Sequence, residues 1–347
     1  MKHYYDIIFL SNTPSFYKVN LCNEIGKKRK LLLVLLGYGD EAVNSHLNDA
    51  SELKFDFVFL NKGDMYKRNR FIVFVKLINL LRSIRYKKIL YSGWMLTEFN
   101  IVSFFLPKDK NVVICESTIW ESNMRGLKGW TKRCIISRMG TALPSGIPHK
   151  ALFESIGYKG KIHITGGVGL INYGKRGKNT MSRDKFRYLY VGRLTSVKNL
   201  KFLINAFNEN GKELTIVGKG EQEEELKNMA HSNIHFIGFV DNEKLASIYE
   251  QHDIFILPSS YEAWGLVVEE ALYWGLPVLV SDKVGCGPDL VQTYKSGLTF
   301  KSNDYNDLQE SINRLELSYN NILINVNNID WTARRLNQIT TYEKIAY

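Results

Sequence analysis

Two cations follow an apolar run in the second half of the 347-residue chain. Arg193 and Lys198 lie five residues apart, directly after the run that ends at Gly192. A guanidinium offers a planar fork to phosphate oxygens and an ammonium offers a compact charge, so the two can converge on one diphosphate. Two solvated surface cations would have the same spacing, and the pattern alone leaves both interpretations open.

A glycine turn, Val217-Gly218-Lys219-Gly220, follows the next apolar run. Its glycines allow the backbone either to approach a ligand or simply to turn tightly. The third glycine of the dinucleotide-binding fingerprint is missing, so the motif does not indicate that class of site.

Two carboxylates, Glu262 and Glu270, stand with seven residues between them in the stretch 258–277. A carboxylate repels phosphate but accepts hydrogen bonds from hydroxyls, which a sugar supplies in number. Stabilisation of a helix start is the alternative role for Glu262, and a satisfied polar group on a helix flank is the alternative for Glu270. We expect Glu269, not Glu270, to face solvent.

The same stretch predicts a helix that starts near Gly265 and stops at Gly275, where glycine is followed by Leu276-Pro277. The free amides of Gly265, Leu266 and Val267 would favour an anion at the helix start. A further glycine loop, residues 281–290, leads towards a helix at Asp289 and either adds amides around the anion or only turns the chain.

Short apolar runs alternate with helical patterns along the whole chain, which predicts parallel, doubly wound α/β sheets. The expected strands are residues 6–10, 31–36, 55–60, 88–91, 112–115, 141–143, 187–191, 213–217, 234–236, 254–257, 277–280 and 298–300. The expected helices of the second half are residues 200–208, 221–230, 242–251 and 265–274.

The length and a polar, aperiodic stretch at residues 173–184 predict two domains joined by a linker. The domains are residues 1–172 and 185–330, and residues 331–347 are expected to form a helix that packs back on the first. Two such domains would face a central cleft at the carboxyl ends of their strands, where open α/β sheets bind ligands.

The formal charge of +11 is unevenly distributed. Residues 1–170 hold 26 Lys and Arg against 13 Asp and Glu (+13), and residues 171–347 hold 20 against 22 (−2). A solvated basic surface and an anionic membrane surface or lipid-linked substrate both remain open. Nucleic acid is disfavoured, because no RNA- or DNA-binding motif is present.

The four scattered cysteines exclude a disulfide scaffold, and no Cys/His cluster indicates a structural zinc. No secretory signal is visible, and the most apolar stretch, residues 71–81, is too short to span a bilayer. We expect a cytoplasmic protein, either free or peripheral on the inner face of the plasma membrane.

The order and spacing of these motifs across residues 187–300 resemble retaining glycosyltransferases of family 4. The Glu-x7-Glu element together with Arg193 and Lys198 carries the resemblance. The first half of the chain resembles the family only loosely, through residues 14–19. The resemblance implies a GT-B fold of two Rossmann-like domains and a nucleotide-sugar donor such as a UDP- or GDP-sugar. It implies no metal and no other cofactor.

The resemblance also implies roles for individual residues. Arg193 and Lys198 would bind the donor diphosphate, Glu262 would face the transferred sugar, and Glu270 would hold the ribose hydroxyls. The other donor-binding residues would be those that supply amides, close backbone approach or the base cradle: Gly192, Gly218, Lys219, Gly238, Phe239, Trp264, Gly265, Leu266 and Val267.

The chain departs from the family in its first half. Many members have a histidine near the transferred sugar, whereas this chain reads Glu116-Ser117-Thr118 after the strand 112–115. Glu116 is our candidate for the position, which the protein could also leave unused. Tyr17 and Trp94 are candidates either for acceptor contacts or for packing.

The motifs favour a glycosyltransferase, and the resemblance implies that it is retaining and metal-independent. We expect it to extend a lipid-linked glycan in bacterial surface polysaccharide synthesis, such as O-antigen, capsule or lipopolysaccharide. A phosphorylase-like or sugar-nucleotide-processing enzyme of the same fold is an alternative. A non-catalytic nucleotide-sugar-binding protein is another.

Overall fold

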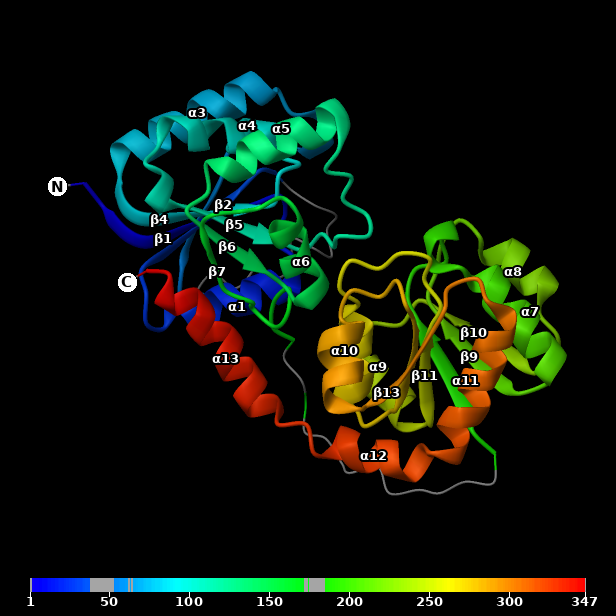
Figure 1. Cartoon of the computed structure of the whole chain (residues 1–347). Helices are drawn as coiled ribbons and strands as arrows, with labels where there is room; N and C mark the ends of the chain where they lie inside the picture. Colours follow the sequence, from blue (N-terminus) through cyan, green and yellow to red (C-terminus); the bar gives the residue numbers. More distant parts are fainter. Residues whose placement is uncertain are drawn as a thin grey trace. The chain divides into compact units, whose positions relative to one another are not determined.

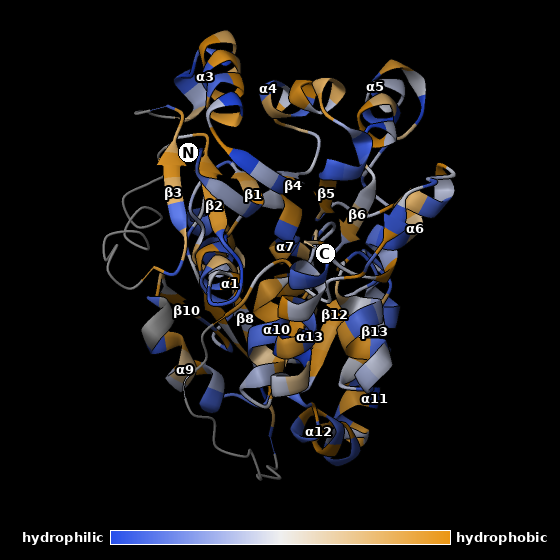
Figure 2. Cartoon of the chain, turned by 90° about the vertical axis from the view of Figure 1, so that its left-hand side faces the viewer, coloured by the Kyte–Doolittle hydropathy of each residue, from blue (hydrophilic) through white to orange (hydrophobic). Residues whose placement is uncertain are grey.

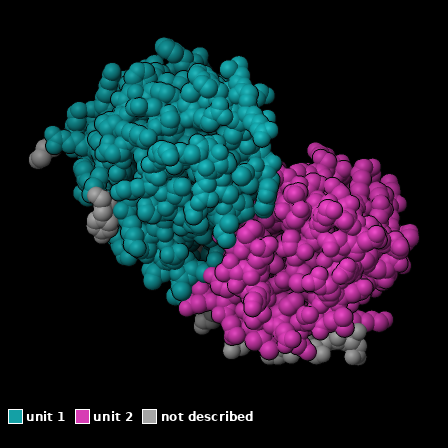
Figure 3. All heavy atoms as spheres, in the orientation of Figure 1, with its two compact units in different colours: residues 1–172, 332–347 teal, residues 173–331 magenta. Residues whose placement is uncertain are grey.

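The computed structural model describes residues 2–37, 53–61, 63, 65–171, 174 and 185–346 (Figure 1). The chain divides into two compact units (Figure 3). Residues 1–172 and 332–347 form the first unit, and residues 173–331 form the second. The predicted linker, residues 173–184, lies outside the described residues except for Gly174.

The first unit is built on a seven-stranded parallel sheet in the order β3-β2-β1-β4-β5-β6-β7. Its strands are β1 (Tyr4–Ser11), β2 (Leu31–Leu35), β3 (Asp56–Phe59), β4 (Arg85–Ser92), β5 (Asn111–Cys115), β6 (Thr141–Pro144) and β7 (Lys161–Ile162). The sequence predicts six of these, but not β7, because two residues are too few to give a periodic pattern.

Alternating residues of β1 enter two separate cores, because successive side chains of a strand point to opposite faces. Ile8 and Leu10 pack with α3 (Arg70–Ser83), α4 (Thr97–Asn100), η3 (Ile101–Phe105) and α5 (Gly126–Ser137). Ile7 and Phe9 pack with α1 (Phe16–Gly26) and α13 (Trp331–Lys344). The unit therefore has three layers, with helices on both faces of the sheet (Figure 1).

The second unit contains a six-stranded parallel sheet in the order β10-β9-β8-β11-β12-β13. Its strands are β8 (Arg187–Val191), β9 (Glu213–Val217), β10 (Ile234–Gly238), β11 (Ile254–Leu257), β12 (Val278–Ser281) and β13 (Gly297–Phe300). Its helices are α7 (Leu200–Asn210), α8 (Glu223–Met229), α9 (Asn242–Glu250), α10 (Leu266–Tyr273), α11 (Tyr305–Leu317) and α12 (Tyr319–Asn327). The prediction of two doubly wound α/β units is confirmed.

The helix at Asp289 has an unexpected form. Residues Gly287–Gln292 form a π-helix, η6, in which backbone hydrogen bonds join residues five apart and not four apart as in an α-helix. Pro288 at its start lacks an amide hydrogen, so the first turn cannot donate at that position.

The final helix, α13, belongs to the first unit although the second unit precedes it in the chain. Ile339 and Tyr342 are buried in the core that contains α1. Arg335 lies 3.0 Å from Glu24 of α1 in an ion pair. None of the helices among the described residues is both long and apolar enough to cross a bilayer.

Tyr342 gives a test of this packing. We expect Tyr342→Ala to destabilise the first unit by about 3–5 kcal/mol, because it leaves a cavity where a fully buried ring was. Faster hydrogen exchange of the β1 amides would report the effect. Leu336→Ala, at an exposed position of the same helix, is the matched control, and equal effects of the two substitutions would contradict the packing.

Candidate functional site

Four neighbouring strands of the second sheet end at one edge, because all of them run parallel. They are β9, β8, β11 and β12 in sheet order. The predicted cation loop follows β8, the glycine turn follows β9, and the loop with Glu262 follows β11. The fold thus brings together motifs that lie up to about 70 residues apart in the sequence, at the edge where open α/β sheets bind ligands.

Lys198 and Glu262 are the core of this site. Lys198 lies in a single 3₁₀ turn, η5 (Ser196–Lys198), and its ammonium donates to the Glu262 carboxylate. The two side chains are 14% and 18% exposed, so the ion pair is largely shielded from water. The Ser260 amide donates to the Val197 carbonyl at 2.9 Å and joins the two loops a second time. The structure therefore brings these two predicted residues into contact.

The glycines after β8 and β9 let two loops touch at their backbones. A Cβ on Gly218 would lie 1.9 Å from the Gly192 carbonyl oxygen, and the φ of Gly218 is +140°. The Gly218 amide donates to the carbonyl of Gly238, at the end of β10, at 2.7 Å. Gly192, Gly218 and Gly238 therefore form one continuous backbone surface. Position 218 must be glycine, because any side chain there would collide with the Gly192 carbonyl.

Arg193 extends from this surface. Its carbonyl accepts a hydrogen bond from the Tyr190 hydroxyl at 2.9 Å, which fixes the backbone, while the residue itself is exposed. Phe239, directly after Gly238, is also exposed. The site thus offers a guanidinium and an aromatic ring to a ligand at the edge of the sheet.

The loop before α10 is held by the loop after β12. The Gly285 amide donates to the Glu262 carbonyl and the Cys286 amide to the Trp264 carbonyl, both at 2.9 Å. Gly285 must be glycine, because a Cβ there would lie 1.8 Å from the Ala263 carbonyl oxygen. The predicted glycine loop therefore positions the start of α10 through hydrogen bonds to the backbone of the preceding loop.

The start of α10 has the form that its sequence predicts. Gly265 is the N-cap residue, with a φ of +98°, and Leu266 begins the helix. The first amides of a helix lack partners within it and carry its partial positive charge. Gly265, Leu266 and Val267 therefore present main-chain hydrogens at the same edge as Lys198.

Trp264 contributes through its backbone. Its indole is buried and its Nε1 donates to Glu269 at 3.2 Å. The expectation that Glu269 faces solvent is wrong, because this indole contact draws the carboxylate into the core.

Glu270 is an acidic group in an unfavourable environment. The Tyr249 hydroxyl donates to its carboxylate at 3.1 Å. Burial raises the pKa of Glu270 to about 7, the Tyr249 hydrogen bond opposes this shift, and the charge of Glu269 adds to it. A ligand that donated hydrogen bonds to Glu270 would favour the ionised form.

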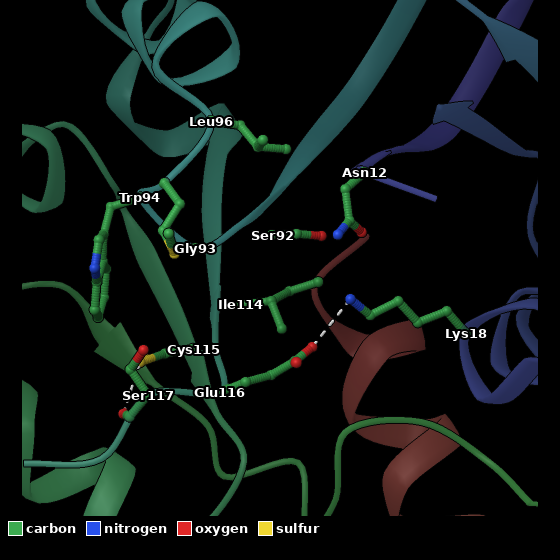
Figure 4. A pocket seen from close by; sticks show the side chains of 11 residues that line it. Asn12, Lys18, Ser92, Gly93, Trp94, Leu96, Ile114, Cys115, Glu116 and Ser117 are labelled. Atoms are coloured by element: carbon green, nitrogen blue, oxygen red, sulfur yellow. Dashed lines mark hydrogen bonds and ion pairs between the residues drawn. The ribbon is translucent and has the colours of Figure 1, made fainter. Parts of the chain in front are cut away.

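The first unit has a cavity of about 210 Å³ beside the ends of β4 and β5 (Figure 4). Glu116 and Lys18 meet at its wall, with 3.2 Å between the ammonium and the carboxylate. Lys18 is buried; burial lowers its pKa, but Glu116 outweighs that effect and the net pKa is raised, so the ammonium stays charged. Sequence reasoning missed Lys18, although it lies in the segment 14–19 that follows the first strand.

The two candidate acceptor residues differ in their surroundings. Trp94 lines the cavity, but it is mostly buried and the Lys132 ammonium lies 5.8 Å from its ring centre. Tyr17 packs edge-on against Phe16 at 5.4 Å and its carbonyl accepts from the Leu170 amide. Both side chains have clear packing roles, whatever else they contact.

Sequence comparison shows what the second unit is similar to. Residues 174–329 match the family model described as glycosyl transferases group 1. This part of the chain is similar to group 1 glycosyltransferase domains.

Individual relatives match shorter stretches. An uncharacterized glycosyltransferase of Haemophilus influenzae is 32% identical over 155 residues, which are 42% of each chain. The O-antigen biosynthesis glycosyltransferase WbnH of Escherichia coli is 37% identical over 105 residues, 29% of this chain and 30% of the relative. A glycosyltransferase of Methanocaldococcus jannaschii is 33% identical over 111 residues, 29% of this chain and 28% of the relative. The matches thus span less than half the length of these relatives.

Solved structures match the whole chain. The lipopolysaccharide outer core galactosyltransferase WaaB superposes with a TM-score of 0.73 at 15% identity, over 97% of this chain and 99% of that one. Anabaena Alr3699/HepE in complex with UDP superposes with a TM-score of 0.72 at 17% identity, over 100% and 98%. At such low identity these matches establish the fold, which is GT-B as predicted.

Glu270 gives a prediction about pH. A carboxyl whose folded pKa is about 7, against 4.5 ordinarily, keeps its proton longer when folded, so its ionisation removes stability as pH rises from about 4.5 to 7. We expect Glu270→Gln to be relatively more stable than wild type by roughly 3 kcal/mol at pH 8, with most of this difference gone at pH 5. Urea denaturation at both pH values measures it, and identical pH dependence in the two proteins would contradict the assigned pKa.

Proposed function

We propose that this protein is a retaining glycosyltransferase that moves a sugar from a nucleotide-sugar donor to a glycan acceptor, lipid-linked and destined for a bacterial surface polysaccharide. The observation that carries the proposal is the Lys198–Glu262 contact at the strand ends, beside the start of α10. This arrangement lies within residues 174–329, the stretch that matches the group 1 glycosyltransferase model.

The donor diphosphate would bind between two side-chain cations and the helix start. Lys198 supplies an ammonium whose position is fixed by Glu262, and exposed Arg193 supplies a fork for phosphate oxygens. The amides at the start of α10 would take the phosphate next to the sugar. Lys219, within the glycine turn, adds a further cation to the same edge.

The rest of the donor would use the neighbouring groups. Hydroxyls of the ribose would donate to Glu270, which compensates a carboxylate that burial otherwise disfavours. Gly238 and Phe239 would cradle the base, because an exposed ring offers a stacking surface. Among the structural relatives, HepE was solved with UDP and with UDP-glucose, which supports a uridine nucleotide as the first donor to test.

The chemistry that this site can supply is stabilisation of a leaving group. When the bond from the sugar to the diphosphate breaks, negative charge develops on the phosphate oxygen that leaves. Arg193, Lys198 and the helix amides would stabilise that charge without a metal ion. The departing diphosphate would accept the proton of the attacking acceptor hydroxyl on the same face of the sugar, so that the configuration at the anomeric carbon is retained.

Glu262 would have two tasks. Its carboxylate orients Lys198 and can also accept a hydrogen bond from a hydroxyl of the transferred sugar. The first unit would bind the acceptor. Glu116, which lines the cavity of that unit, would take the position of the histidine that many family members have near the transferred sugar. The named roles of WbnH and WaaB in O-antigen and lipopolysaccharide synthesis support a surface glycan as the product.

Lys198→Ala tests the proposal. We expect it to reduce transfer from the sugar nucleotide by about 100-fold or more, because one of the two cations that stabilise the leaving diphosphate is lost. Lys201→Ala is the matched control: Lys201 lies in the next helix turn and pairs with Glu225 at the surface. Release of the nucleoside diphosphate in the presence of acceptor is the measurement, and an unchanged melting temperature shows that the fold is intact.

The same assay separates the alternatives. Transfer at the wild-type rate in Lys198→Ala would contradict the assigned site. Release of nucleotide by wild type without acceptor would indicate a sugar-nucleotide-processing enzyme, and tight donor binding without turnover would indicate a binding protein.

A further inference from the structure

Three neighbouring segments of the first unit expose apolar side chains on the side of the sheet opposite to α1 and α13. We call this surface the apolar face. Its most exposed members are Phe71 (74%), Phe105 (69%), Leu127 (77%) and Trp130 (56%). Its remaining members are Ile72, Val75, Ile101 and Phe104.

Side-chain contacts join the segments into one surface. Phe74 of α3 packs against Phe105 of η3, with 6.4 Å between ring centres. Arg138, at the end of α5, lies 5.8 Å from the ring centre of Phe104 and donates to the Leu106 carbonyl at 3.3 Å. Two views show α3, α4 and α5 side by side over the same side of the sheet (Figures 1 and 2).

The exposed residues are not required by the core of the unit. The inner faces of the same helices already fill that core, with Val73 and Leu77 from α3, Val102 from η3 and Ile136 from α5. A group of exposed aromatic and aliphatic side chains on neighbouring segments is a usual sign of an interaction site.

The charge around the apolar face has one sign. Residues 65–83, 95–105 and 125–138 contain ten Lys and Arg and a single acidic residue, Glu98. Glu98 is buried and bound to Arg68, so it does not offset the surface charge. Exposed cations such as Lys67, Arg70 and Lys128 therefore border exposed aromatic rings.

We propose that the apolar face docks on an anionic membrane. Aromatic and aliphatic side chains would enter the headgroup region, and the bordering cations would pair with acidic lipid headgroups, as in amphipathic surfaces that lie in the plane of a membrane. The choice of a membrane over another acidic partner rests on the proposed function, whose acceptor is lipid-linked. The composition of the face stands without it.

The basic run at residues 27–30 belongs to a different surface. It follows α1, on the other side of the sheet, where Lys27 pairs with Glu24 at 2.9 Å and Lys28 with Glu343 at 3.3 Å. Acidic partners there reduce the local field. The structure therefore assigns membrane contact to two other basic runs of the first half, residues 67–70 and 125–138.

Vesicle co-sedimentation of the full chain tests this assignment. We expect wild type to bind vesicles of phosphatidylcholine with phosphatidylglycerol and not vesicles of phosphatidylcholine alone. Phe71→Ser/Trp130→Ser should weaken binding about tenfold or more, because two inserted side chains are lost. Lys67→Ser/Lys128→Ser should weaken binding and make what remains less dependent on salt.

Two matched controls define the outcome. Lys27→Ser/Lys30→Ser removes the same net charge from the other surface, and Leu317→Ser removes an exposed apolar side chain from the second unit. Both should bind vesicles like wild type. Equal losses in the control and face variants, or no binding by wild type, would overturn the proposal.

Two further readouts separate this proposal from others. We expect sedimentation velocity without lipid to show the same oligomeric state for wild type and Phe71→Ser/Trp130→Ser. A wild-type dimer that this double substitution dissociates would assign the face to a second copy of the chain and overturn membrane docking. The substituted residues lie in the first unit, outside the donor site of the second unit, and a water-soluble acceptor requires no membrane. Transfer to such an acceptor should therefore be unchanged in the face variants. Failure of vesicle binding with intact transfer would refute the docking alone.

Discussion

The ion pair between Lys198 and Glu262 is the interaction on which the site of the second unit depends. It joins the loop after β8 to the loop after β11, two strands that are neighbours in the sheet. An exposed ion pair contributes little to stability, and a shielded one is offset by the loss of hydration. The pair is better explained by what it positions, which is a cation beside the start of α10.

A second constraint comes from groups whose placement in the folded chain is unfavourable in free energy. Glu270 is ionisable but sits where burial favours its protonated form. Gly218, Gly265 and Gly285 adopt conformations or close contacts that other residues would not tolerate. Sites with such strain and desolvation are where ligands are commonly bound, because the ligand supplies the missing partners. The cost therefore points to the same edge of the sheet as the charges do.

The sequence predicts the second unit better than the first. Its strands are short apolar runs that end in glycine, cations or proline, and β8, β9 and β11 occur at the expected residues. Contacts across the fold were harder to foresee. Glu269 enters the core because Trp264 donates to it, and Lys18 becomes a partner of Glu116 because β1 and β5 lie on either side of β4. The apolar face is likewise invisible as a unit in the sequence, because three separate segments build it.

The most direct test of the central claim is a crystal structure of the full chain with UDP or another nucleoside diphosphate chosen by thermal-shift screening. The account predicts phosphate oxygens within hydrogen-bond distance of Lys198 and Arg193 and of the amides at the start of α10, with the ribose hydroxyls on Glu270. A nucleotide bound elsewhere, with Lys198 and the start of α10 free of phosphate, would contradict it.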